Sequence, residues 1–193
     1  EGGFKQLSYQ QEPNQIIWCA RNDGQLAGLT YQREQQVVAW HRHIFGGSFG
    51  SGNAVCDSVA TIPTDDSEYQ TWVIVKRTIN GATKRYIEYI HEYDFDETDD
   101  TSFNFLDSQL SYDGSAASTI SGLAHLEGQT VSILANGAAH PNKVVSSGEV
   151  ILERSATKVK IGLPYTSLLQ TMRIDAGSQN GTSQSKTKRI YDI

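Results

Sequence analysis

The stretch that most constrains the fold runs from residue 16 to residue 46, where three short apolar segments alternate with turns. The segments are 16–20, 26–31 and 37–43. Asn22-Asp23-Gly24 separates the first two, and these residue types tolerate the positive φ that a hairpin turn demands. Polar residues 32–36 separate the second and third. Three consecutive antiparallel strands form a meander, which is the unit of a β-propeller blade or of a β-sandwich sheet.

A second set of strands is predicted between residues 54 and 89. Asn80-Gly81 lies between the apolar runs 72–79 and 83–89, and Asn-Gly in that setting is the strongest short-range hairpin signal. A preceding strand, 54–62, ends at Pro63. Trp18 and Trp72 open similar strand–turn–strand units, a weak repeat at a spacing near that of propeller blades. Two blades cannot close a ring, so a partial propeller and a small sandwich both remain open. We expect both tryptophans to be core residues.

Residues 92–107 mark a change of character, because acidic side chains there are interleaved with aromatic ones. We interpret this segment as a domain boundary and residues 109–118 as an extension of the linker. Strand patterns resume at residue 119, and a turn-rich loop is expected at 136–142. Two further strands are expected at 149–153 and 158–161, with 155–157 as the turn between them. A small β-barrel of about five or six strands fits this span.

The fold class is therefore all-β: blade-type antiparallel meanders, forming a partial β-propeller or sandwich, plus a small β-barrel. We divide the chain into a blade-type region at 1–106, the barrel at 107–177, and a flexible loop with a returning strand at 178–193. Residues 165–175 fit a helix or a strand equally well. Residues 177–187 are low-complexity, and 188–193 have a strand pattern. Because the chain begins with Glu1 and ends just after that pattern, we interpret it as a piece of a longer protein.

The charge balance bears on possible partners. The net charge is −6 and the pI is about 5.3, which argues against bulk affinity for nucleic acid, since neutralised phosphates supply that affinity. No stretch approaches the ~20 apolar residues of a membrane-spanning helix. Cys19 and Cys56 form no C-x-x-C motif, and we interpret both as small buried hydrophobes.

One motif has the letters of a hydrolase nucleophile elbow. Gly46-Gly47-Ser48-Phe49-Gly50 fits G-x-S-x-G. That motif works only on a sharp strand-to-helix turn, beside a His and an acid. The residues that follow, 51–62, are small and then strand-like, so no helix is expected. We interpret the motif as a glycine-rich loop.

Three segments resemble metal or modification sites. His41 and His43 share one face of a strand, as paired zinc or copper ligands can, but no third ligand is evident. The acidic run 94–100 resembles a calcium loop, yet it lacks the glycine at the sixth position and the closing Glu at the twelfth. Asn180-Gly181-Thr182 matches a glycosylation sequon. We predict no catalytic residue, no cofactor-binding residue, no metal ligand and no cofactor.

Three strings of residues, which together span 16 to about 175, carry a family resemblance. The first is Trp18, Asp23-Gly24, Leu29-Thr30-Tyr31, Val37 and Trp40-His41-Arg42. The second is Trp72 to Arg77, Asn80-Gly81 and Arg85 to Glu88. The third is Leu123, Leu126-Glu127-Gly128, Val131, Ala135-Asn136-Gly137 and Ile161 to Tyr165. Together they resemble the tail nozzle (tail tubular B-type) proteins of short-tailed bacteriophages. The third string resembles a small β-barrel likened to the first catalytic cysteine half-domain of the ubiquitin-activating enzyme.

The resemblance implies a non-enzymatic structural protein of the virion, located in the phage tail. Such a protein forms part of the distal nozzle ring through which DNA exits. The implied partners are copies of itself, six in the intact ring, together with adjacent adaptor, fibre or plug proteins. DNA would pass without sequence-specific binding, and no membrane insertion is implied. The alternative is a module that binds a host glycan or protein through exposed aromatics. A third reading, a polysaccharide-cleaving tail enzyme, requires two acids in a cleft with opposite pKa shifts.

Overall fold

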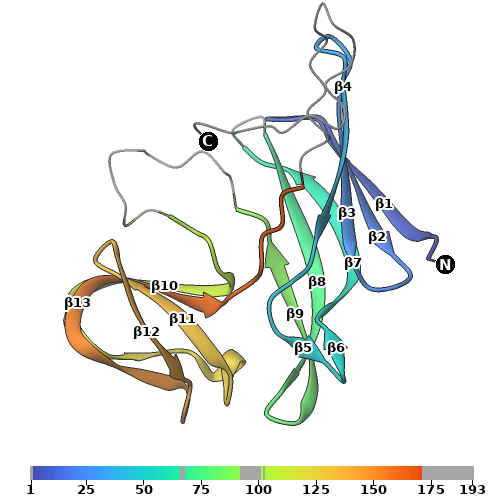
Figure 1. Cartoon of the computed structure of the whole chain (residues 1–193). Coiled ribbons are helices and arrows are strands. Elements are labelled where there is room, and N and C mark those ends of the chain that lie inside the picture. The colour runs from blue at the N-terminus through green and yellow to red at the C-terminus, as the bar shows by residue number, and fades with distance from the viewer. Residues whose placement is uncertain (1, 66–67, 92–100, 102, 171–193) are drawn as a thin grey trace, which may run out of the picture.

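The fold is all-β and built from antiparallel sheets, as predicted (Figure 1). The computed structural model describes residues 2–65, 68–91, 101 and 103–170. Within these ranges the only helical element is a single 3-10 turn, η1 (Ala124–Leu126). The described part therefore holds no helix that could cross a bilayer.

The first sheet is a four-stranded meander in the order β1-β2-β3-β4. Its strands are β1 (Phe4–Gln10), β2 (Ile16–Arg21), β3 (Leu26–Gln32) and β4 (Val37–His43). The three strands predicted from residues 16 to 43 are confirmed, and Gly24 closes the first turn at φ 85°. The sequence reading missed β1, whose mostly polar residues pair with β2 across an irregularity between Phe4 and Gln6.

The second sheet has three strands in the order β7-β8-β9. They are β7 (Val55–Pro63), β8 (Tyr69–Ile79) and β9 (Ala82–Tyr89). The predicted Asn80-Gly81 hairpin is confirmed, with φ of 48° and 72° at its two central residues. A short hairpin of β5 (Ser48–Phe49) and β6 (Gly52–Asn53) precedes this sheet.

The first core lies between these two sheets, which stack face to face. Trp18, Ala20 and Leu26 from the first sheet meet Cys56, Val59, Val73 and Val75 from the second. Trp18 is 4% exposed, which confirms its predicted core position. The same prediction for Trp72 was wrong. Val73 and Val75 face the core, and alternation along β8 turns Trp72 to the other face, where it is half-buried against Tyr89.

The third sheet has the order β10-β13-β11-β12 and encloses a core of its own. Its strands are β10 (Asp107–Ser121), β11 (Thr130–Ala135), β12 (Ala138–Val144) and β13 (Glu149–Leu163). The sheet is strongly curved (Figure 1). Within the described residues no pairing joins β10 to β12, so the sheet is open at that point.

Three local predictions in this region were wrong. Residues 109–118 belong to β10 and not to a linker, because they pair with β13 despite their polar composition. Most of the expected loop 136–142 belongs to β12, since Asn136-Gly137 makes a tight turn with both residues at positive φ. The expected turn at 155–157 lies inside β13, where the buried positions change phase between Ala156 and Val159. Residues 165–170 form no regular element, and the predictions for 92–100, 171–187 and 188–193 lie outside the described residues.

Candidate functional site

The most elaborate polar arrangement is at the junction between the second and third sheets, and we call it the junction cluster. It consists of Gly46, Arg77, Glu88 and Asp107. Arg77 is on β8, Glu88 on β9, Asp107 begins β10, and Gly46 lies in the loop after β4. The loop after β4, the β8–β9 hairpin and the start of β10, which are distant in sequence, therefore meet at one point.

Arg77 is at the centre of the junction cluster and is fully buried, with 0% exposure. Its guanidinium forms a two-pronged ion pair with Glu88: Nη1 donates to Oε1, and Nη2 donates to Oε2 at 3.1 Å. Its Nε donates to the Gly46 carbonyl at 2.8 Å. This buried cation is thus paired and hydrogen-bonded, as a charge in a low-dielectric interior must be.

Asp107 links the third sheet to the same loop. Its Oδ2 accepts the Gly46 N–H at 2.6 Å. Burial raises the pKa of the Asp107 carboxyl, and the Gly46 hydrogen bond and the nearby Arg77 only partly oppose that rise. The Gly46 carbonyl is therefore bound by Arg77 of the second sheet, and the Gly46 N–H by Asp107 of the third sheet.

The glycine-rich loop is thus a structural joint. Ser48 begins the β5–β6 hairpin and is followed directly by the strands β6 and β7, so the strand-to-helix turn of a nucleophile elbow is not formed. A Cβ at Gly46 would come within 2.7 Å of the Pro164 carbonyl oxygen. Gly47 has φ 87°, where side chains are strained, and packs near Arg77 and Leu163. This role could not be predicted from the sequence, because the partners of Gly46 lie 31 and 61 residues away.

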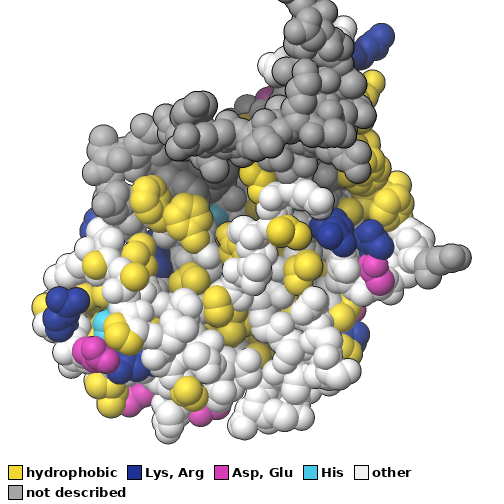
Figure 2. Space-filling model, in the orientation of Figure 1, with side chains coloured by type: hydrophobic (Ala, Val, Ile, Leu, Met, Phe, Trp, Pro, Cys, Tyr) yellow, Lys and Arg dark blue, Asp and Glu magenta, His cyan; other side chains and the backbone are white. Residues whose placement is uncertain are grey.

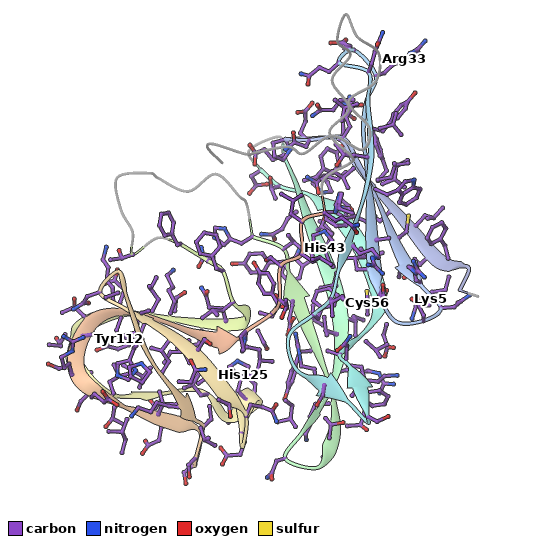
Figure 3. The ribbon with its side chains drawn as sticks, viewed as in Figure 1. Lys5, Arg33, His43, Cys56, Tyr112 and His125 are labelled. Carbon is purple, nitrogen blue, oxygen red and sulfur yellow. The ribbon has the colours of Figure 1, made fainter. Side chains whose placement is uncertain are left out.

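A hollow of about 1480 Å³ borders the junction cluster and is lined by residues of all three sheets. Glu88 and Asp107 both line it, so two acids do approach one cavity, as the enzyme reading requires. Each is already engaged, Glu88 by Arg77 and Asp107 by Gly46. His125 lies on the side of the third sheet that faces β9 (Figure 3) and meets the Tyr86 ring edge-on at 6.1 Å. Its Nε2 is 3.0 Å from the Ser108 carbonyl oxygen.

The two strand histidines form a second cluster, beside Trp18. His41 Nδ1 is 2.7 Å from His43 Nε2, so one ring donates a hydrogen bond to the other. His41 Nε2 is 3.3 Å from the Thr30 hydroxyl. Trp18 meets both rings, with centroids 5.6 Å and 5.2 Å away. Gly28 makes room for this contact, because a Cβ there would lie 2.2 Å from the His41 ring.

Both histidines are neutral at neutral pH. Burial lowers the pKa of His41. Burial, and secondarily the charge of His41, lowers the pKa of His43 to about 4. In the parts of the chain that the structure describes, no three His, Cys, Asp or Glu side chains converge as metal ligands. Cys19 and Cys56 are buried free thiols, whereas residues 94–100 and Asn180 lie outside the described residues.

We expect acid to destabilise the protein through His43. Its pKa is about 4 in the folded chain, below the ordinary 6.5, so the unfolded chain takes up the proton first. The stabilisation is complete above pH 6.5 and is lost as the pH falls towards 4, by about 3 kcal/mol in total. Urea unfolding of the wild type and of His43→Leu at several pH values tests this. The variant should show the weaker pH dependence, and equal slopes would contradict the assignment.

Compared with models of protein families and with curated protein sequences, the chain matches none of them.

Proposed function

We propose that this chain is a non-enzymatic structural part of a short phage tail, within the distal nozzle ring through which DNA exits. The support from sequence is the resemblance carried by the three strings. The first string lies on β2 to β4, the second on β8 and β9, and the third on η1, β11 and β13. Each string thus coincides with strands or turns that hold a sheet together.

The observation that carries the proposal is that both stacked sheets expose large apolar side chains on their outer faces, beside basic ones such as Arg42 and Arg85, as well as towards their shared core. Leu7, Val38 and Trp40 of the first sheet are all more than half exposed. In the second sheet Ile87 is 71% exposed and Tyr89 is about half exposed. A sheet that ends a domain normally turns a polar face to water. Sheets with two apolar faces are the interior layers of a longer array, such as a propeller or a ring of subunits.

The buried charges favour a structural role over a catalytic one. Arg77, Glu88 and Asp107 hold one another and the Gly46 backbone, and this use of charge fixes the relative position of sheets. The net charge of −6 suits a channel component, because an acidic protein does not retain the DNA phosphates that pass it.

A second candidate function, binding of a host glycan or protein, is favoured by one specific feature. Phe4 and Trp40 stack with ring centroids 5.9 Å apart and planes 13° apart, and both are more than half exposed. Exposed aromatic platforms of this kind anchor sugar rings and protein partners. Under this reading, Trp40→Ala would abolish binding to host cells.

Assembly of the intact parent protein tests the primary proposal. We expect rings when the parent is mixed with its portal-side tail adaptor, measured by light scattering and negative-stain microscopy. Repeated head-to-tail contacts close into a ring when the rotation between copies allows it. A parent that stays monomeric with its adaptor present would contradict the nozzle function and favour the glycan-binding module.

A further inference from the structure

The outer face of β1–β4 is the first of two apolar surfaces that are exposed among the described residues. Strand register defines it: Tyr9, Ile17, Leu29 and Trp40 lie opposite one another across the four strands. Alternation places them on the side of the sheet away from Trp18. The remaining members, from neighbouring positions on this face, are Phe4, Leu7, Tyr31 and Val38.

Small buried residues and a stacked aromatic pair give this face a defined shape. Small residues, Cys19 and Ala27, lie opposite each other at its centre and are buried. Phe4 comes from one edge strand and Trp40 from the other, and their rings stack. Figure 2 shows hydrophobic side chains gathered along the margin of the molecule where β1 to β4 lie. The face thus presents a preformed aromatic ridge with aliphatic flanks.

The outer face of β7–β9 is the second surface. Its members are Ile62, Trp72, Ile74, Ile87 and Tyr89, which alternate with the core residues Val73 and Val75. Trp72 and Tyr89 pack with ring centroids 5.4 Å apart. Ile87 is 71% exposed, and Ile62 and Tyr89 are about half exposed. Because the two sheets stack through their inner faces, these two outer faces lie on opposite sides of one two-layer stack.

The size of the first face limits what can cover it. Four of its exposed side chains are aromatic, each with roughly 150–250 Å² of surface, and about half of each is exposed, so about 400 Å² of aromatic area is open. Leu7 and Val38, each more than half exposed, enlarge a patch that lies within the range for the largest patch on an ordinary monomer, roughly 300–600 Å². It is smaller than the roughly 800 Å² per partner of a specific protein interface, so a contact through it is expected to be weak. A sheet of similar size is needed to bury it.

We propose that the outer face of β1–β4 binds the outer face of β7–β9 of a second copy of this chain, head to tail. This one contact buries both apolar surfaces, whereas a symmetric pairing through either face would leave the other exposed. It also repeats the stacking already present within the chain, where a face of the first sheet packs on a face of the second. At this interface size the association is expected to be weak, and its strength depends on how well the faces fit as well as on the buried area.

Complementary surface variants test the contact. Val38→Asp places a charge on the first face and Ile87→Asp on the second, at positions 62% and 71% exposed, so folding is preserved. Val144→Asp and Ile151→Asp are matched controls, since these residues are 58% and 64% exposed on the third sheet, away from both faces. Circular dichroism and melting temperature verify that each variant is folded.

Sedimentation velocity over a range of roughly 5–500 µM gives the readout, since weak association is populated only at high concentration. The wild type and both controls should associate as concentration rises. Each face variant should associate at least about tenfold more weakly, because a charge is desolvated without a partner. An equal mixture of the two face variants should form dimers and nothing larger, since one intact pair of faces remains.

Other outcomes overturn the proposal. A wild-type chain that stays monomeric throughout the range would show that something other than a second copy covers these faces. Association lost in Val38→Asp but kept in Ile87→Asp would indicate a symmetric contact through the first face. The place of this contact in a tail rests on the proposed ring function, but the sedimentation measurement uses this chain alone. If the chain does not associate, the ring assembly of the intact protein is still tested by its own experiment. If the intact protein forms no ring, the contact between copies of this chain is still tested by sedimentation.

Discussion

Replacing Arg77 with Ala is expected to lower the free energy of unfolding by about 3–5 kcal/mol, because it leaves buried partners without their cation. Glu88 would lose both of its bonds to the guanidinium, and the Gly46 carbonyl would lose its donor. Urea unfolding at pH 7 measures the change.

Arg85→Ala is the matched control. Arg85 is on the neighbouring strand and also pairs with a carboxylate, Asp57 at 2.8 Å, but its side chain is 58% exposed. Exposed ion pairs contribute up to about 1 kcal/mol, so the control should be nearly neutral. The double variant Arg77→Met with Glu88→Leu should be less destabilised than Arg77→Ala, since no charge is left buried alone. Equal losses for Arg77→Ala and Arg85→Ala would contradict the junction cluster.

Replacing Trp18 with Ala is the second large expected effect, a loss of about 3–5 kcal/mol. Trp18 is buried in the first core, its indole N–H donates to the Gln10 side chain at 2.9 Å, and both strand histidines pack on it. Trp72→Ala serves as the comparison, because Trp72 is half-buried on the outer face of β7–β9 and should cost about 1–2 kcal/mol. Thermal and urea unfolding of both variants measure the difference. A larger loss for Trp72 would mean that the described register of β8 is wrong.

The strands between tight turns could be predicted from the sequence, because the local chemistry of the turns is sufficient to define them. Asn22-Asp23-Gly24 and Asn80-Gly81 each separate two strands as expected. Asn136-Gly137 is a turn signal of the same kind, and β12 follows it directly. The expected loop at 136–142 did not take that signal into account. The strands β1 and β10 were missed because their residues are largely polar, and only pairing with β2 and β13 fixes them.

The face of a strand was harder to predict than its existence. In β8, Trp72 and Ile74 are apolar on one face, and Val73 and Val75 on the other. Period-two alternation then allows either face to be the core, and the sequence alone does not decide between them. Arg77 is buried because Glu88 and Gly46 satisfy it, and these partners come together only in three dimensions. The junction cluster could not be predicted for the same reason.

Electron cryomicroscopy of the intact phage particle tests the central claim most directly. The nozzle proposal predicts a ring at the distal end of a short tail, into whose density β1 to β4, β7 to β9 and the curved third sheet fit in every subunit. Residues of this chain would line or surround the channel through which DNA exits. A particle that shows this chain only at the tip of a fibre or on a side appendage, with a different protein forming the distal ring, would contradict the proposal.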